Sequence, residues 1–346
     1  MPIERIRREQ HALILGARGS ALAMAQIGLA RAMLRKAHPK LEIEIRVIKT
    51  RGDIMPTASL ARGESKGLFI RELEQALLRR KIDVAVHSLK DLPTELPAGL
   101  MLAAVSERED TRDILIALSV DALRAPPIVL TSSPRRAFQA KLLWPDCETR
   151  EIRGNVETRL RKLAEAGKNH TLVLAVAGLR RLDLLRGDQD EGVFFREPHL
   201  FYRKLSLDEM LPAPGQAALG FETRATDGIT QERLRLINHF VSWSAVTAER
   251  AFLQALGGGC AMPIAACASV SPEGMRLRGL VFDKKGNPCC GETTPLRVKS
   301  PWEGWERVWR GEKTGSQREA ENLGKALAQE YLKTKGQRAV EKPGNA

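Results

Sequence analysis

The sequence predicts an α/β protein with two lobes, followed by a small α+β domain that carries an antiparallel three-stranded sheet. Two observations predict the lobes: short apolar runs alternate with helical segments in residues 11–108, and again in residues 113–178. A third predicts the last domain, because after glycines at 257–259 three strand candidates follow one another with turn residues between them. Two lobes imply a cleft between them.

The first lobe shows a regular alternation of strands and helices. A strand at 11–15 leads into a glycine turn, and a helical pattern rich in Ala and Leu follows to about Ala37. Residues 41–47 alternate apolar and charged side chains, as a half-exposed strand does. A helix over 67–80 and a strand over 82–86 follow, so the segment predicts βαβ units.

The second lobe repeats this pattern from about Asp113. We expect a strand at 128–130, a helix from Ser133, a strand near 151–152 and a helix from Asn155, and then a strand at 172–176.

The third segment differs in composition and period. A helix is predicted over 244–256, and strands over 264–270, 276–282 and 292–298. Residues 333–346 are polar and are expected to fray.

The charge of the chain favours anionic ligands. The 346 residues are 43% hydrophobic and carry a formal net charge of +13, which attracts nucleic acid, an acidic membrane surface or a polycarboxylate substrate. Aromatic residues make up only 5%, and no basic stretch is interleaved with aromatics for stacking bases. A nucleic-acid partner therefore has only the charge in its favour.

The cysteines and the first residues predict a cytoplasmic protein. The five cysteines are an odd number without C-x-x-C spacing, which argues against a zinc ribbon or a disulfide framework. Residues 1–10 are charged and lack an apolar signal region, and no apolar stretch approaches a membrane span.

An acid and a base arrive together where the 82–86 strand ends, in His87-Ser88-Leu89-Lys90-Asp91-Leu92-Pro93. In open α/β sheets ligands bind at the carboxyl ends of strands, so Asp91 and Lys90 are candidates for facing a substrate. The alternative is that they only shape the turn before Pro93.

Arginines recur at the starts of helices and after strands. Basic residues in a helix's first turn oppose its dipole, so Arg135 and Arg136 behind Ser132-Ser133-Pro134 suit an anion better than they suit stability. The alternative is that they are solvated surface arginines. The other arginines in comparable positions are Arg18, Arg153, Arg159 and Arg181.

Cys260 follows three glycines, which can leave its sulfur accessible on a mobile loop. Taken alone, it reads better as a small buried hydrophobe after a helix cap. The histidines have no metal-ligand spacing, and the Gly16–Gly19 turn lacks a nucleotide-binding fingerprint.

The motifs in order resemble those of the porphobilinogen deaminase (hydroxymethylbilane synthase) family over residues 11–335. These motifs are Ala17-Arg18-Gly19-Ser20-Ala21-Leu22-Ala23, Thr50-Arg51-Gly52-Asp53, Lys66-Gly67-Leu68-Phe69, the His87–Pro93 segment, Ser132–Arg136, Arg153-Gly154-Asn155-Val156, Leu174–Leu179 and Gly258-Gly259-Cys260. This ordered set reverses the reading of Cys260.

The resemblance implies two lobes like those of periplasmic binding proteins and a third domain that holds a covalent dipyrromethane cofactor. The implied boundaries are residues 1–108 plus about 212–230 for lobe 1, 109–211 for lobe 2 and 231–346 for the cofactor-attachment domain. The implied activity is that of a deaminating transferase of porphyrin and heme biosynthesis, which joins porphobilinogen units head to tail into the linear tetrapyrrole hydroxymethylbilane. We therefore expect a monomer that takes porphobilinogen and needs no nucleic acid, membrane or metal.

The resemblance also assigns roles to single residues. Asp91 would be catalytic, stabilising positive charge on pyrroles, and Cys260 would carry the cofactor by a thioether. The matching cofactor-binding positions are Ser88, Lys90, Asp91, Thr131, Ser133, Arg135 and Arg136. The substrate-binding positions are Arg18, Ser20, Arg153, Arg159 and Arg181, and Lys66 and Phe69 match a mobile lid.

Overall fold

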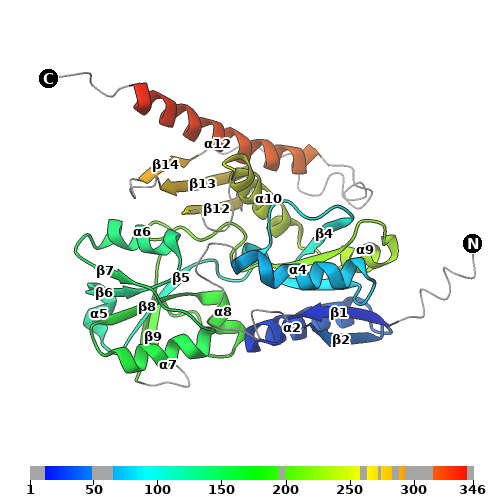
Figure 1. Ribbon diagram of the computed structural model, residues 1–346, viewed down its shortest axis with the longest axis horizontal. Coiled ribbons are helices and arrows are strands. Elements are labelled where there is room, and N and C mark those ends of the chain that lie inside the picture. Colours follow the sequence, from blue (N-terminus) through cyan, green and yellow to red (C-terminus); the bar gives the residue numbers. More distant parts are fainter. Residues whose placement is uncertain are drawn as a thin grey trace, which may run out of the picture.

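The computed structural model describes residues 12–48, 65–194, 199–257, 263–271, 274–282, 288–292 and 315–340. Figure 1 shows two lobes side by side, with a third unit lying above them.

The first lobe is built on a five-stranded sheet of order β2-β1-β3-β11-β4. Its strands are β1 (Leu13–Ala17), β2 (Ile43–Val47), β3 (Val84–Ser88), β4 (Leu100–Val105) and β11 (Leu219–Arg224). β1 pairs in parallel with β2 and β3, whereas β11 runs antiparallel to β3 and β4. The covering helices are α2 (Ala21–Ala37), α4 (Ser65–Leu78) and α9 (Gly228–Arg235).

Helix α2 is capped by Ser20. The Ser20 hydroxyl accepts the N–H of Ala23, which satisfies one of the free donors of the first turn. Ile27, Ala30 and Leu34 recur at helical spacing and are fully buried against the sheet.

The second lobe has a six-stranded sheet of order β7-β6-β8-β5-β10-β9. Its strands are β5 (Asp113–Ala117), β6 (Ile128–Leu130), β7 (Glu148–Arg150), β8 (His170–Ala175), β9 (Glu191–Val193) and β10 (Phe201–Lys204). Its helices are α5 (Val120–Arg124), α6 (Pro134–Leu143), α7 (Val156–Ala166) and α8 (Val176–Arg181).

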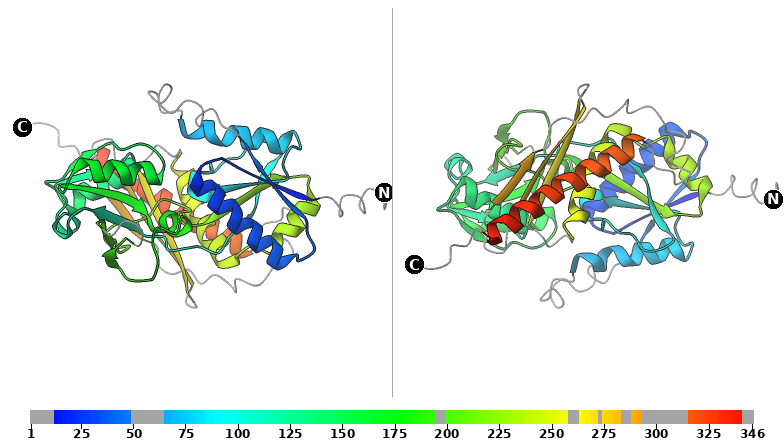
Figure 2. Two further views of the ribbon diagram at one scale, coloured as in Figure 1. Left: turned by 90° about the horizontal axis from the view of Figure 1, so that it is seen from below. Right: turned by 90° about the horizontal axis from the view of Figure 1, so that it is seen from above.

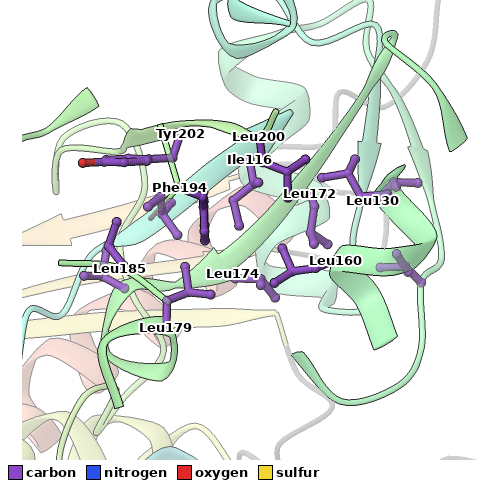
Figure 3. Packing of buried hydrophobic residues seen from close by; sticks show 14 residues of the cluster. Ile116, Leu130, Leu160, Leu172, Leu174, Leu179, Leu185, Phe194, Leu200 and Tyr202 are labelled. Atoms are coloured by element: carbon purple, nitrogen blue, oxygen red, sulfur yellow. The ribbon is translucent and has the colours of Figure 1, made fainter. Parts of the chain in front are cut away.

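The core of the second lobe lies between this sheet and its helices. Figure 3 shows Leu160 of α7 and Leu179 of α8 pointing toward Leu172 and Leu174 of β8. The core includes the β9–β10 hairpin, where Phe194 and Tyr202 meet edge to face with ring centroids 5.7 Å apart.

The chain crosses between the lobes twice, before β5 and again before β11. The lobes also meet where α2 contacts α8. In Figure 2 these helices approach each other when the molecule is seen from below.

The third unit pairs two helices with an antiparallel sheet. The strands β12 (Ile264–Ser271), β13 (Gly274–Phe282) and β14 (Pro288–Glu292) pair in that order, and α10 (Phe240–Ala255) and α12 (Gly315–Val340) pack together. Seen from above, α12 runs across the outside of the molecule (Figure 2). Gly324 allows the close approach, since a Cβ there would lie 2.3 Å from the carbonyl oxygen of Ala248.

The predicted architecture is confirmed: two α/β lobes and a small domain with a three-stranded antiparallel sheet. One strand position was wrong. The strand expected near 151–152 is 148–150, because Ile152 is a loop residue whose side chain fills the core. The third strand of the last domain is described over 288–292, so it meets the predicted strand 292–298 only at Glu292, and residues 293–314 lie outside the described ranges.

The expected fraying of residues 333–346 was also wrong in part, because α12 continues to Val340. The helix is anchored further back by Ala320, Leu323 and Leu327, which are buried at helical spacing. Among the described residues, no helix is both long enough and apolar enough to span a bilayer.

Candidate active site

The turn after β3 stands at the carboxyl end of a central strand. β3 is flanked by β1 and β11, and a single 3₁₀ turn (Leu89–Asp91) follows it. Leu89 is buried and its N–H donates to the carbonyl of Ala218, which fixes the turn to the neighbouring strand. This anchoring leaves Lys90 half-buried and Asp91 exposed.

Ser88 is the last residue of β3 and directly precedes this turn. Its hydroxyl accepts a hydrogen bond of 2.8 Å from the Gln26 amide of α2. Arg18 and Ser20 follow β1, which is the parallel neighbour of β3, so their backbone lies along the same edge of the sheet.

A second group of predicted residues gathers at the start of α6 in the other lobe. Pro134 occupies the first helical position, where a missing N–H costs nothing, and the Thr131 hydroxyl accepts the N–H of Ser133. Arg135 and Arg136 are 4% and 7% exposed, so the reading of these two as solvated surface arginines was wrong.

Asp113, at the start of β5, binds both of these arginines. One carboxylate oxygen accepts Arg135 Nη2 at 2.7 Å and the other accepts Arg136 Nη2 at 2.8 Å. Burial opposes ionisation of this fully buried carboxyl, but the two guanidiniums outweigh it and hold its pKa well below the usual range.

The basic groups at this site outnumber the acids. The Lys90 ammonium lies within the electrostatic influence of Arg135 and Arg136, whose one shared carboxylate is Asp113. Burial, together with the positive charge of Arg136, lowers the pKa of Lys90 to about 8, although Asp91 and Asp113 act in the opposite direction.

Arg159 brings a further cation to the same place. Asn155 caps α7 by accepting the N–H of Thr158, and Arg159 one turn later donates from Nε to the carbonyl of Gly154. Burial and then Arg136 lower the pKa of Arg159, whereas Asp91 raises it. Asp91 and Arg136 therefore each act on both Lys90 and Arg159, although these residues come from both lobes.

The remaining predicted arginines are placed differently. Arg181, at the end of α8, donates from Nη2 to the carbonyl of Ala217 on the second crossing, and burial lowers its pKa to about 10. Arg153 is half exposed and pairs with Glu151. The structure brings neither of them into contact with Asp91.

The remaining predicted residues fall outside the described part of the chain or its described side chains. Cys260 and Thr50–Asp53 lie outside the described residues, and Lys66 and Phe69 belong to the first turn or so of α4, whose side chains are not described there. Within the described ranges, no three His, Cys, Asp or Glu side chains gather to hold a metal ion.

Sequence reasoning missed Asp113 and Gln216. Gln216 is fully buried on the second crossing. Its Oε1 accepts a hydrogen bond of 3.2 Å from Lys90 Nζ, and its Nε2 donates one of 2.9 Å to Asp113 Oδ1. The one signal that pointed toward Asp113 is the Arg135-Arg136 pair, because buried guanidiniums need a carboxylate partner.

Comparison with known proteins settles the family. The family model for the "Porphobilinogen deaminase, dipyromethane cofactor binding domain" matches residues 13–232, and the model for the C-terminal domain matches residues 243–295. The chain belongs to the porphobilinogen deaminase family.

Porphobilinogen deaminases from several bacteria are similar to this chain over most of its length. The protein from Thermus thermophilus is 41% identical over 328 residues, which cover 94% of this chain and 96% of the relative. The protein from Chloroherpeton thalassium is 45% identical over 262 residues, covering 75% and 79%, and that from Chlorobium chlorochromatii is 39% identical over 325 residues, covering 93% and 94%. As a porphobilinogen deaminase, this chain is an enzyme of tetrapyrrole biosynthesis with a dipyrromethane cofactor.

The residues around Asp113 fit that cofactor. A dipyrromethane made from porphobilinogen carries acetate and propionate groups, so its site needs basic donors that are not already matched by protein carboxylates. Arg136 Nε is buried and has no hydrogen-bond partner among the described residues, which suits a carboxylate acceptor. Lys90 adds an ammonium with three N–H donors.

Proposed function

We propose that this enzyme joins porphobilinogen units head to tail into hydroxymethylbilane, starting from a dipyrromethane attached to Cys260. The observation that carries the proposal is the excess of basic side chains over carboxylates where the two lobes meet, with Lys90, Arg135, Arg136 and Arg159 against Asp91 and Asp113. A chain of pyrroles bearing acetate and propionate groups is a polyanion that such a site attracts.

Each addition has a defined balance of atoms. The C–N bond of the substrate's aminomethyl group breaks and ammonia leaves, a C–C bond forms to the α-carbon of a terminal pyrrole, and that carbon loses its hydrogen as a proton. When bound, the dipyrromethane supplies the first such α-carbon. The remaining requirements are to bind carboxylates, to stabilise positive charge on the reacting pyrrole and to move a proton.

Asp91 is suited to the second and third of these tasks. It is exposed at the end of β3, so substrate can reach it, and it lies in the electrostatic influence of Lys90 and Arg159. We assign it the stabilisation of positive charge on pyrrole nitrogens and assistance to proton transfer.

The polar and basic residues divide between two tasks in this proposal. The cofactor is held by Ser88, Lys90, Thr131, Ser133, Arg135 and Arg136. The carboxylates of the substrate and of the growing chain are bound by Arg18, Ser20, Arg153, Arg159 and Arg181. A lid includes Lys66 and Phe69.

The proposed protein is a cytoplasmic monomer of three domains, with no nucleic-acid or membrane partner. The domains are residues 1–108 with 212–230, residues 109–211 and residues 231–346.

Intact mass measurement tests the attachment. Protein from a host supplied with porphobilinogen should be heavier than its sequence by one dipyrromethane and should give colour with Ehrlich's reagent after denaturation. Cys260→Ser should lack both the extra mass and the colour, while Cys267→Ser, which changes a buried thiol, keeps them. A wild-type mass equal to that of the bare sequence would refute the proposal.

Asp91→Ala separates chemistry from cofactor binding. We expect this variant to keep the added mass and to lose most of its production of hydroxymethylbilane and of ammonia. A variant that turns over normally would remove Asp91 from the mechanism.

A further inference from the structure

Gln216 links the two lobes at the base of the basic cluster. It lies on the second crossing between β10 and β11, is fully buried, and joins Lys90 of lobe 1 to Asp113 of lobe 2. Its backbone is held as well, because its carbonyl accepts Arg108 Nε at 2.8 Å and its N–H donates to the carbonyl of Ala213.

The orientation of the Gln216 amide is fixed by its partners. Oε1 accepts Lys90 Nζ at 3.2 Å, while Nε2 donates to the carbonyl of Thr111 at 2.7 Å and to Asp113 Oδ1 at 2.9 Å. A flipped amide would set its oxygen against a carbonyl and a carboxylate, and its NH₂ group against an ammonium. One arrangement therefore satisfies every polar atom of this side chain.

The amide also separates two opposite charges. Asp113 is already shared by Arg135 and Arg136, and Lys90 reaches it only through Gln216. In a buried site, an ammonium next to a carboxylate would form a direct ion pair and lose its capacity to bind another anion. The bond to Gln216 uses one N–H of Lys90 and leaves the charge of the ammonium uncompensated by Asp113 at contact distance.

We propose that Gln216 is a positioning residue of the cofactor site, which holds Lys90 at the cleft and keeps it from pairing directly with Asp113. This inference rests on the proposed function only in that Lys90 binds the cofactor. Gln216 acts through Lys90 and does not itself contact the reacting atoms.

The first test measures cofactor assembly. Full-length Gln216→Leu protein, produced without cofactor and then given porphobilinogen, should gain the dipyrromethane mass about tenfold more slowly than wild type, since the charge-assisted hydrogen bond that holds Lys90 is lost. The matched control is Gln231→Leu, which replaces a buried amide of α9 that donates to two backbone carbonyls, and it should load at the wild-type rate. Equal loading of Gln216→Leu and wild type would overturn the proposal.

The second test reads Lys90 directly and does not need the cofactor. In the Cys260→Ser background, labelling of Lys90 by acetic anhydride as a function of pH reports the pKa of its ammonium, because only the neutral amine reacts. The charges acting on this group are Arg136, Asp91, Asp113 and Arg135. Gln216→Leu removes the amide that keeps Lys90 from Asp113, so by this proposal the two pair directly and the midpoint should rise from about 8 by about one pH unit or more.

The two tests distinguish failure of the proposed function from failure of the proposal about Gln216. A wild-type protein without dipyrromethane mass would refute the proposed function, yet a shifted midpoint would still show that Gln216 controls Lys90. A midpoint unchanged by Gln216→Leu would show that the amide does not keep Lys90 from pairing with Asp113, whatever the cofactor.

Discussion

Replacing Asp113 by Asn should strongly destabilise the second lobe. Asn keeps the shape of Asp but removes the charge that two buried guanidiniums share, with hydrogen bonds of 2.7 and 2.8 Å. Removing one partner of a buried ion pair costs about 3–5 kcal/mol, and because Asn retains one acceptor oxygen we expect a loss of about 3 kcal/mol.

Equilibrium unfolding in urea, followed by circular dichroism, measures this loss. The matched control is Asp188→Asn, because Asp188 also pairs with an arginine at 2.7 Å but its side chain is 97% exposed, so the loss there should stay below about 1 kcal/mol. The cost should also depend on pH. The pKa of Asp113 is depressed, so its stabilisation is fully present above the unfolded value of about 3.9 and is lost as the pH falls further.

The reasoning fails if Asp113→Asn and Asp188→Asn cost the same. It also fails if the difference between Asp113→Asn and wild type grows, instead of shrinking, as the pH falls below about 4. Either result would mean that water or other groups compensate the two guanidiniums without the carboxylate.

Three further predictions concern backbone strain, buried charge and packing. Ala217 has a φ of 76°, so Ala217→Gly should raise the urea midpoint by relieving up to about 1 kcal/mol of strain, and a lowered midpoint would contradict this. Burial and then Glu222 raise the pKa of Glu74, so its ionised form destabilises the folded state above about pH 4.3. Glu74→Gln should therefore raise the melting temperature at pH 8 but not at pH 4. An equal rise at both pH values would argue for another cause. Gly324→Ala should destabilise the third unit by about 1–3 kcal/mol, because its Cβ would lie 2.3 and 2.7 Å from backbone atoms of α10. The control is Gly28→Ala on α2, whose Cβ would meet nothing within 4 Å and which should stabilise the folded protein. Thermal melts that rank the two variants in the opposite order would refute the packing argument.

The sequence was sufficient for the elements whose signals are local. The helix expected from Asn155 does begin there, with Asn155 as its cap, and a strand does end just before Lys90 and Asp91. Apolar runs could not distinguish a strand from a buried loop residue, which is why Ile152 drew the predicted strand past residue 150.

The partners of the site residues depend on contacts between distant parts of the chain. Asp113 meets its arginines 22 and 23 residues later, and Lys90 meets Gln216 after 126 residues. Neither residue carries a motif, since an Asp before an apolar strand and a Gln after a glycine are common. Charge composition predicted an anion site but could not show that one buried carboxylate organises it.

The place of β11 in the first sheet has a consequence for synthesis on the ribosome. β11 lies between β3 and β4, yet its residues leave the exit tunnel only after the whole β5–β10 sheet has emerged. The later lobe can therefore complete its sheet first, while two strands of the earlier lobe wait with unpaired edges. Nascent chains that end before residue 219 should accordingly be the ones that recruit chaperones.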